Sequence, residues 1–212
     1  MEQKDMLITR LRKLPVPLLH IIDLSRDLAK KQDVGIYLVG GFVRDLLLGV
    51  ENLDLDIVVE REGIDFAYRL ASLFDAQLIK HRAFGTATIT TKDGTKIDIA
   101  TSRQEYYPAP AALPCVTGGS IRDDLFRRDF TINALACHID SERFGELVDF
   151  FDGVSDLRKK RIRFLHEKSF IDDPIRIIRA VRFEQRLGFH IDAKTARFIR
   201  LAKEEKMLER VQ

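Results

Sequence analysis

The chain has few metal-binding or disulfide-forming side chains and no long apolar run. It contains two cysteines, Cys115 and Cys137, and five histidines that are scattered singly. This spacing suits neither a disulfide framework nor a zinc site. No segment approaches the roughly 18 consecutive apolar residues of a membrane-spanning helix, and the N-terminal MEQKDMLITRLRKL carries charges where a secretion signal needs an apolar stretch. These absences predict a soluble cytoplasmic protein without a membrane partner.

The charge of the chain is divided unevenly along its length. The net charge is +2, and 45% of the 212 residues are hydrophobic, enough for a buried core. Residues 158–212 carry 16 Lys and Arg against 8 Asp and Glu, whereas residues 1–157 carry 19 against 25. An acidic part followed by a basic part suggests a polyanion held against a cation-binding site. A solvated helical surface rich in Lys and Arg explains the same charges.

Periodicity and turn signals predict a mixed α and β domain followed by a helical segment. Apolar spacing predicts helices at 15–32, 42–49, 64–75 and from 124 through RRDFTINALA at 127–136, and Asp173-Pro174 begins another. The β-rich runs are 36–39, 53–59, 161–165 and the hairpin 86–90/96–100, whose connection contains Asp93-Gly94. The segment YYPAPAALPCVTGGS at 106–120 is predicted to be a loop.

The most informative stretch is YLVGGFVRDLLLGVENLDLDIVVE at 37–60. Asp54 and Asp56 are two apart in a predicted strand, so they share one face while Leu53, Leu55 and Ile57 face the core. Two such carboxylates suit Mg²⁺, which prefers oxygen ligands and is usually completed by substrate phosphates. A solvent-exposed edge strand is the alternative explanation of the same pattern.

Neighbouring residues favour a nucleotide triphosphate as the ligand. Gly40-Gly41 lies between a strand and a helix, where backbone and the helix N-terminus can approach phosphates. Arg44, one turn later, offers a fork of donors. Neither G-x-x-x-x-G-K-[ST] nor G-x-G-x-x-G occurs, so the common nucleotide-binding loops are absent. If the hairpin lies beside the 53–59 strand, Asp98 becomes a third carboxylate of a two-metal site.

The motifs resemble those of a known family. L-V-G-G-x-V-R-D-x-L-L-G followed by D-x-D is similar to the polymerase-β-like nucleotidyltransferase superfamily. Within it, the chain resembles class II tRNA nucleotidyltransferases (CCA-adding enzymes) and bacterial poly(A) polymerases. Three further motifs follow in the family's order: Arg127-Arg-Asp-Phe-Thr-Ile-Asn133, Asp152-Gly-Val-Ser-Asp-Leu157 and Asp172-Asp-Pro-Ile-Arg176-Ile-Ile-Arg179. The family usually has Glu-Asp where this chain has Asp172-Asp173.

The resemblance implies an α+β fold with two parts. These are a nucleotidyltransferase head at 1–165, with a mixed sheet and flanking helices, and an all-helical neck at 166–212. It also implies functional residues. Asp54 and Asp56 would hold Mg²⁺ and act with Asp98 in catalysis. The nucleotide-binding residues would be Gly40, Gly41, Arg44, Arg128, Asp173, Arg176, Arg179 and Arg182.

In such enzymes an acid and an arginine of the neck read the base of CTP or ATP, here Asp173 and Arg176. Asp173 before proline is also an ordinary helix N-cap. Arg176, Arg179, Arg182 and Arg186 fall on one face of the predicted helix without a carboxylate partner, which suits phosphate or base contacts.

The implied reaction is transfer of C or A to the 3′ end of tRNA. CCA, CC and A addition stay open, and LIKHRAFGTATI at 78–89 resembles the tRNA-directed members more than the poly(A) polymerases. Poly(A) synthesis and a non-catalytic nucleotide-binding regulatory module are the alternatives. Family members continue into helical body and tail domains, so we expect this chain to be part of a longer protein.

Overall fold

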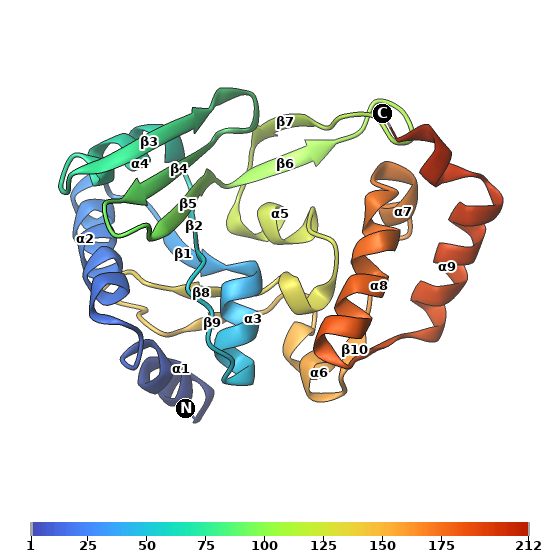
Figure 1. Ribbon diagram of the computed structural model, residues 1–212, viewed down its shortest axis with the longest axis horizontal. Helices are drawn as coiled ribbons and strands as arrows, with labels where there is room; N and C mark the ends of the chain where they lie inside the picture. Colours follow the sequence, from blue (N-terminus) through green and yellow to red (C-terminus); the bar gives the residue numbers. More distant parts are fainter. Residues whose placement is uncertain (1, 212) are drawn as a thin grey trace.

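The computed structural model describes residues 2–211 and is built on a seven-stranded mixed sheet (Figure 1). The strand order is β3-β4-β5-β2-β1-β8-β9. Only β2 and β5 are parallel; the other neighbouring pairs of this sheet are antiparallel. The strands are β1 (Ile36–Val39), β2 (Leu55–Val59), β3 (Ala76–His81), β4 (Thr86–Thr91), β5 (Lys96–Thr101), β8 (Ala136–His138) and β9 (Leu147–Val148).

Along the chain, helices come before, between and after the strands of the sheet (Figure 1). Before residue 165 the helices are α1 (Glu2–Leu11), α2 (Val16–Gln32), α3 (Gly40–Leu48), α4 (Gly63–Ala71), α5 (Ile121–Phe126) and α6 (Gly153–Arg158). After residue 165 come α7 (Ser169–Asp172), α8 (Ile175–Leu187) and α9 (Ala193–Glu204). Single 3-10 turns are η1 (Arg82–Phe84), η2 (Thr131–Asn133) and η3 (Met207–Arg210). Within residues 2–211, none of these helices has the length and apolar character needed to cross a membrane.

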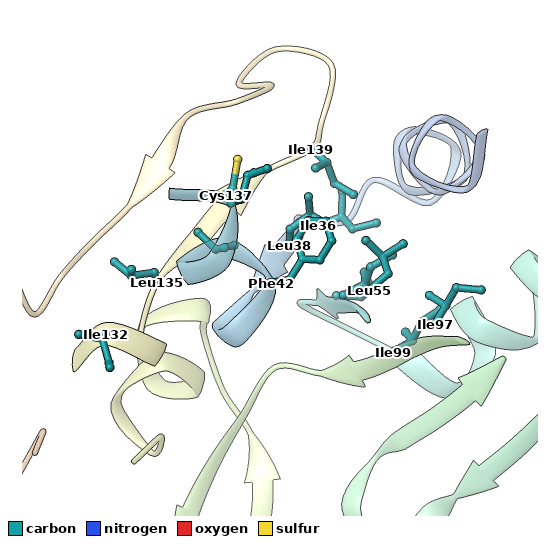
Figure 2. Close-up of a cluster of buried hydrophobic side chains, with 14 of the residues drawn as sticks. Ile36, Leu38, Phe42, Leu55, Ile97, Ile99, Ile132, Leu135, Cys137 and Ile139 are labelled. Carbon is teal, nitrogen blue, oxygen red and sulfur yellow. The ribbon is translucent and has the colours of Figure 1, made fainter. Parts of the chain in front are cut away.

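The main core forms on one face of the sheet because alternate strand residues are apolar. Ile36 and Leu38 of β1, Leu55 of β2, and Ile97 and Ile99 of β5 are buried together (Figure 2). Burial of this kind stabilises by roughly 25 cal/mol per Å² of apolar surface. The opposite sheet face packs against α5 in a second cluster of buried residues: Tyr37, Val39, Val58, Ile121, Leu125, Ala134, Ala136 and Val148.

The sequence prediction of a mixed sheet with flanking helices is confirmed, and several element predictions are wrong. The 106–120 segment is not all loop, because it contains β7 (Cys115–Gly118), which pairs antiparallel with β6 (Arg103–Tyr106). RRDFTINALA is not α-helical: α5 ends at Phe126, only Thr131–Asn133 forms a 3-10 turn, and the last residue, Ala136, opens β8. Leu53 is not in the core; it lies before β2 and is 48% exposed.

The segment after residue 165 is helical except for one short strand. β10 (Arg161–Ile162) pairs in parallel with β11 (His190–Ile191), so this ladder joins the two sides of the predicted boundary. Gly188 ends α8 in a left-handed conformation and Asp192 caps α9. The division at 165/166 stays a prediction. In the view of Figure 1, α8 lies to the right of α3 and α5, and the β6–β7 hairpin lies above α5.

Candidate active site

A cavity of about 1080 Å³ lies between the head and α8. Its walls come from the start of α3, the approach to β2, the 107–114 loop, the 127–133 segment and α8. Every nucleotide-binding residue predicted from the sequence except Gly40 lines it, together with Asp54 and Asp56. The fold therefore brings the residues predicted to bind phosphate, to hold the metal and to read the base to one cavity.

Asp54 and Asp56 lie where β2 enters the sheet. Asp56 is half-buried within β2, whereas Asp54 is exposed and precedes the first strand residue, Leu55. The pairing of Leu38 with Ile57 places Asp56 beside the end of β1, where Gly40 begins α3. The strand thus presents its carboxylate next to the glycine turn.

Asp98 is the direct neighbour of Asp56 in the parallel β2–β5 ladder. Directly paired residues point to the same sheet face, so the hairpin lies where the sequence argument required it. Asp98 is exposed, accepts a 2.6 Å hydrogen bond from the Thr88 hydroxyl and does not line the cavity. Its role in catalysis stays a prediction.

The carboxyl group of Asp56 has a raised pKa. Its pKa is raised from 3.8 to about 6: burial is the largest cause, the guanidinium of Arg128 acts in the opposite direction, and the carboxylates of Asp98 and Asp54 add to the rise. Burial therefore disfavours ionised Asp56, and a bound cation would favour it.

We expect Asp56→Asn to stabilise the metal-free protein in a pH-dependent way. Because the folded-state pKa lies above 3.8, folding favours the protonated acid, so wild-type stability falls as pH rises from about 4 to about 6. The stability gain of Asp56→Asn should grow over that interval and reach roughly 2–3 kcal/mol above it. Urea unfolding in EDTA between pH 4 and 8 measures this, and a gain that does not vary with pH would contradict the assignment.

Gly40 is required by both backbone conformation and space. Its φ is +68°, and a Cβ there would lie 2.6 Å from Nη1 of Arg128. Its N–H donates to the carbonyl of Leu135 at 2.9 Å. The start of α3 has no side-chain cap, and Gly41, in its first turn, lines the cavity, so a ligand there can reach helix N-terminal amides that no N-cap side chain occupies.

Gly40→Ala should reduce both stability and nucleotide affinity, and Gly94→Ala is its matched control. Gly94 has a φ of +86°, and a methyl group added there would meet no heavy atom within 4 Å, so its substitution costs only backbone strain of about 1 kcal/mol. At Gly40 the methyl must also displace Arg128. We expect nucleotide affinity, measured by equilibrium binding, to fall in Gly40→Ala and not in Gly94→Ala. Equal affinities in the two variants would show that the close packing of Gly40 against Arg128 has no role in nucleotide binding.

Arg44 lines the cavity but is already engaged with protein groups. The residue is 2% exposed, and its guanidinium binds Asp45 through two 2.8 Å contacts, while Nη1 donates to Asn133 at 2.7 Å. Its carbon Cζ lies 5.3 Å from the Phe183 ring centre on α8. The Arg44 guanidinium, which the sequence predicts to bind phosphate, thus also links α3 to the 127–133 segment and to α8.

Arg128 is held at the cavity by a buried acid. Its Nη2 donates to Asp124 at 2.8 Å, and Asp124 also accepts from Arg127 at 2.7 Å. These two guanidinium groups outweigh the effect of burial and hold the pKa of Asp124 below its usual value. Arg128 therefore carries a fixed positive charge near Asp56.

Asp173 precedes α8, and Arg176 lies in its first turn. Asp173 accepts a 3.1 Å hydrogen bond from the Ile175 N–H, but the N-cap position is Pro174 and no side chain caps α8, so the alternative explanation of Asp173 as an ordinary N-cap is wrong. Arg176 is 4% exposed, and its Nε lies 3.5 Å from Asp173 Oδ2. Its other nitrogens donate to Ser169 and to the carbonyls of residues 127 and 128 at 2.6–3.0 Å.

The remaining arginines of α8 differ in their surroundings. Arg179 donates to Asp129 at 2.8 Å, so the expectation of an arginine face without acidic partners is wrong for Arg176 and Arg179. Their partners come from the turn before α8 and from the 127–133 segment, which helical spacing does not reveal. Arg182 and Arg186 are exposed, and Arg186 reaches only within 3.9 Å of Asp45.

Sequence reasoning missed the polar residues that hold these arginines. Asp45, Asp129 and Asn133 are buried, and Asn133 donates to Asp129 at 2.9 Å while it accepts from Arg44. All three lie inside the quoted motifs V-R-D and R-R-D-x-x-x-N. Their position inside these motifs could have marked them as functional residues. Which arginine each one binds depends on the tertiary fold.

The comparison with family models decides the family. The model of the "Poly A polymerase head domain" matches residues 36–163. The chain belongs to this head-domain family. The matched range contains the glycine turn, the D-x-D carboxylates and the 127–133 segment, so the resemblance seen in the sequence is confirmed.

Curated relatives of this head domain act on tRNA. The chain is 50% identical over 194 residues to an A-adding tRNA nucleotidyltransferase of Geobacter sulfurreducens, covering 90% of the chain and 22% of the relative. It is 41% identical over 168 residues to a CC-adding tRNA nucleotidyltransferase of Deinococcus radiodurans, covering 79% and 44%. A solved Thermotoga maritima CCA-adding enzyme complexed with tRNA matches with TM-score 0.86 and 42% identity, over 99% of this chain and 47% of that one. The chain therefore spans less than half of each relative.

Proposed function

We propose that this chain is the catalytic head and the beginning of the neck of a template-independent RNA nucleotidyltransferase. It would add C, A or both to the 3′ end of tRNA from CTP or ATP and release pyrophosphate. The observation that carries the proposal is that the D-x-D carboxylates and the arginines of the 127–133 segment and α8 line the same cavity. The tRNA-directed relatives support tRNA as the acceptor. Because tRNA, CTP and ATP are the proposed substrates, we place the activity in the cytoplasm.

The proposed reaction is attack of the RNA 3′-hydroxyl on the α-phosphorus of the nucleotide. A bond forms between the 3′-oxygen and the α-phosphorus, the bond from that phosphorus to the bridging oxygen of the β-phosphate breaks, and the hydroxyl proton is lost. Arg128 would neutralise charge on the triphosphate beside the N-terminus of α3. Asp98 would orient the attacking oxygen from its place beside Asp56.

The acidic residues suit Mg²⁺ as the cofactor. Within residues 2–211, no group of three or more His, Cys, Asp or Glu side chains forms a ready metal cage. Mg²⁺ does not need one, because it is usually held by one or two carboxylates together with substrate phosphates. Asp54 and Asp56 would supply those carboxylates, and the raised pKa of Asp56 marks a place where positive charge is favourable. When bound, the metal would lower the pKa of the attacking hydroxyl and neutralise the triphosphate.

We propose that Asp173 and Arg176 read the edge of the base. Both line the cavity, and the bonds of Arg176 to Ser169 and to two backbone carbonyls fix its orientation. A rigid pair of donors and acceptors is what a protein template for base recognition requires. Arg179 and Arg182 lie further along the same wall and would contact phosphate or base.

The test supplies the full-length protein with Mg²⁺, labelled CTP or ATP and four acceptors. These are tRNAs that end before CCA, after C and after CC, and an oligo(A) primer. We expect extension of tRNA, and the accepted tRNA shows whether the enzyme adds CC, A or CCA. Extension of the primer alone would indicate a poly(A) polymerase. Nucleotide binding without any labelled product would favour a non-catalytic regulatory module.

A further inference from the structure

The two carboxylates of the D-x-D motif are held in place by different means. Asp56 belongs to β2, and the ladder to β5 fixes its backbone. Asp54 lies one residue before the first paired residue, Leu55, so no ladder fixes it. Its N–H donates instead to Oδ1 of the Asn52 side chain, at 2.9 Å.

Asn52 makes a second bond that reaches another element. Its Nδ2 donates to Oδ2 of Asp45 at 2.9 Å. Asp45, on α3, is buried and fixed by the two-point contact with Arg44. A single half-buried amide thus connects the backbone of Asp54 to a rigid buried ion pair. The Asn52 amide provides both the acceptor for Asp54 and the donor for Asp45.

We propose that Asn52 is a positioning residue that holds Asp54 in place for the metal by tying the approach to β2 to α3. The inference rests on the proposed function, because it concerns the proposed Mg²⁺ site. Residues that orient metal ligands typically change metal affinity or activity by about 10–100-fold when they are replaced. Asn52 would therefore control metal affinity without contacting the metal itself.

The experiment measures ATP affinity of the full-length protein in Mn²⁺ and in EDTA, without an RNA acceptor, so that no turnover occurs. The variants are Asn52→Ala, which loses both bonds, and Asn52→Asp, which keeps an acceptor for Asp54 but cannot donate to Asp45. Glu51→Ala, at the exposed neighbouring position, is the matched control for changes in this loop. Asp54→Ala defines the affinity without the first carboxylate.

We expect the gain in ATP affinity from Mn²⁺ to fall about tenfold in both Asn52 variants and to stay at the wild-type level in Glu51→Ala. ATP affinity in EDTA should be unchanged in all of them. A changed affinity in EDTA would overturn the proposal, because Asn52 would then contact the nucleotide. If Mn²⁺ raised the ATP affinity of Asn52→Asp as much as that of the wild type, the hydrogen bond from Asn52 to Asp45 on α3 would have no role in metal binding, and that part of the proposal would be overturned. If the wild-type protein itself gained no affinity from Mn²⁺, the proposed metal site would fail, which distinguishes that failure from a failure of the Asn52 role alone.

Discussion

Replacing Asp54 and Asp56 together by asparagine is expected to lower nucleotide transfer by at least about 10³-fold, which corresponds to ~4 kcal/mol of transition-state stabilisation. Neutral amides keep the shape of the side chains but remove the charge that holds a divalent cation. Single-turnover measurements with tRNA and saturating nucleotide check this at several Mg²⁺ concentrations. Each single variant should also be strongly impaired.

The control for this double variant is the stability of the fold. Because burial and neighbouring carboxylates disfavour the ionised Asp56, its removal should not destabilise the protein, so lost activity cannot be ascribed to unfolding. Asp75→Asn changes an exposed acid that pairs with Lys92 and does not line the cavity, and it should leave transfer unchanged. Turnover near the wild-type rate in the double variant would refute the metal assignment.

Arg176→Ala is expected to be the most destabilising change in the neck, with a loss of roughly 3 kcal/mol in the free energy of unfolding. The variant leaves two backbone carbonyls and the Ser169 hydroxyl without their buried donor and removes the partner of Asp173. Denaturant unfolding measures the loss. Nucleotide selectivity between CTP and ATP should be lost as well, if assayed under conditions in which the protein is folded.

Arg182→Ala is the matched control on the same helix. Arg182 is exposed and makes no side-chain hydrogen bond or ion pair among the described residues, so its removal should change stability by less than about 0.5 kcal/mol. Arg176→Lys keeps the charge but not the planar fork, and we expect it to recover only part of the stability. An Arg176→Ala protein as stable as Arg182→Ala would show that the buried contacts contribute nothing.

Sequence patterns predicted the sheet because its core strands alternate clearly. Leu55 and Ile57 alternate with Asp56, and Ile97 and Ile99 with Asp98, so both the strands and the outward carboxylates followed from period-two spacing. The remaining predicted site residues came from the resemblance to the family motifs. The sequence could therefore predict residues that a local alternation or a motif identifies.

The errors have a different cause. RRDFTINALA contains helix-favouring residues, but burial of Phe130, Ile132 and Leu135 against the core sets its actual path through a 3-10 turn into β8. Tertiary packing there outweighs a weak local preference. Likewise, the partner of Arg179 is Asp129, fifty positions earlier in the chain, and no local spacing could indicate that pair.

The three hydrogen bonds that Arg176 donates to its neighbours also limit how the molecule can move. A rotation of the first turn of α8 must either break the bonds to the carbonyls of residues 127 and 128 or carry that segment with it. These bonds couple the first turn of α8, proposed to read the base, to Arg128, the proposed phosphate ligand. In the proposed function, this coupling would keep the spacing between base contacts and phosphate contacts constant when one base replaces another.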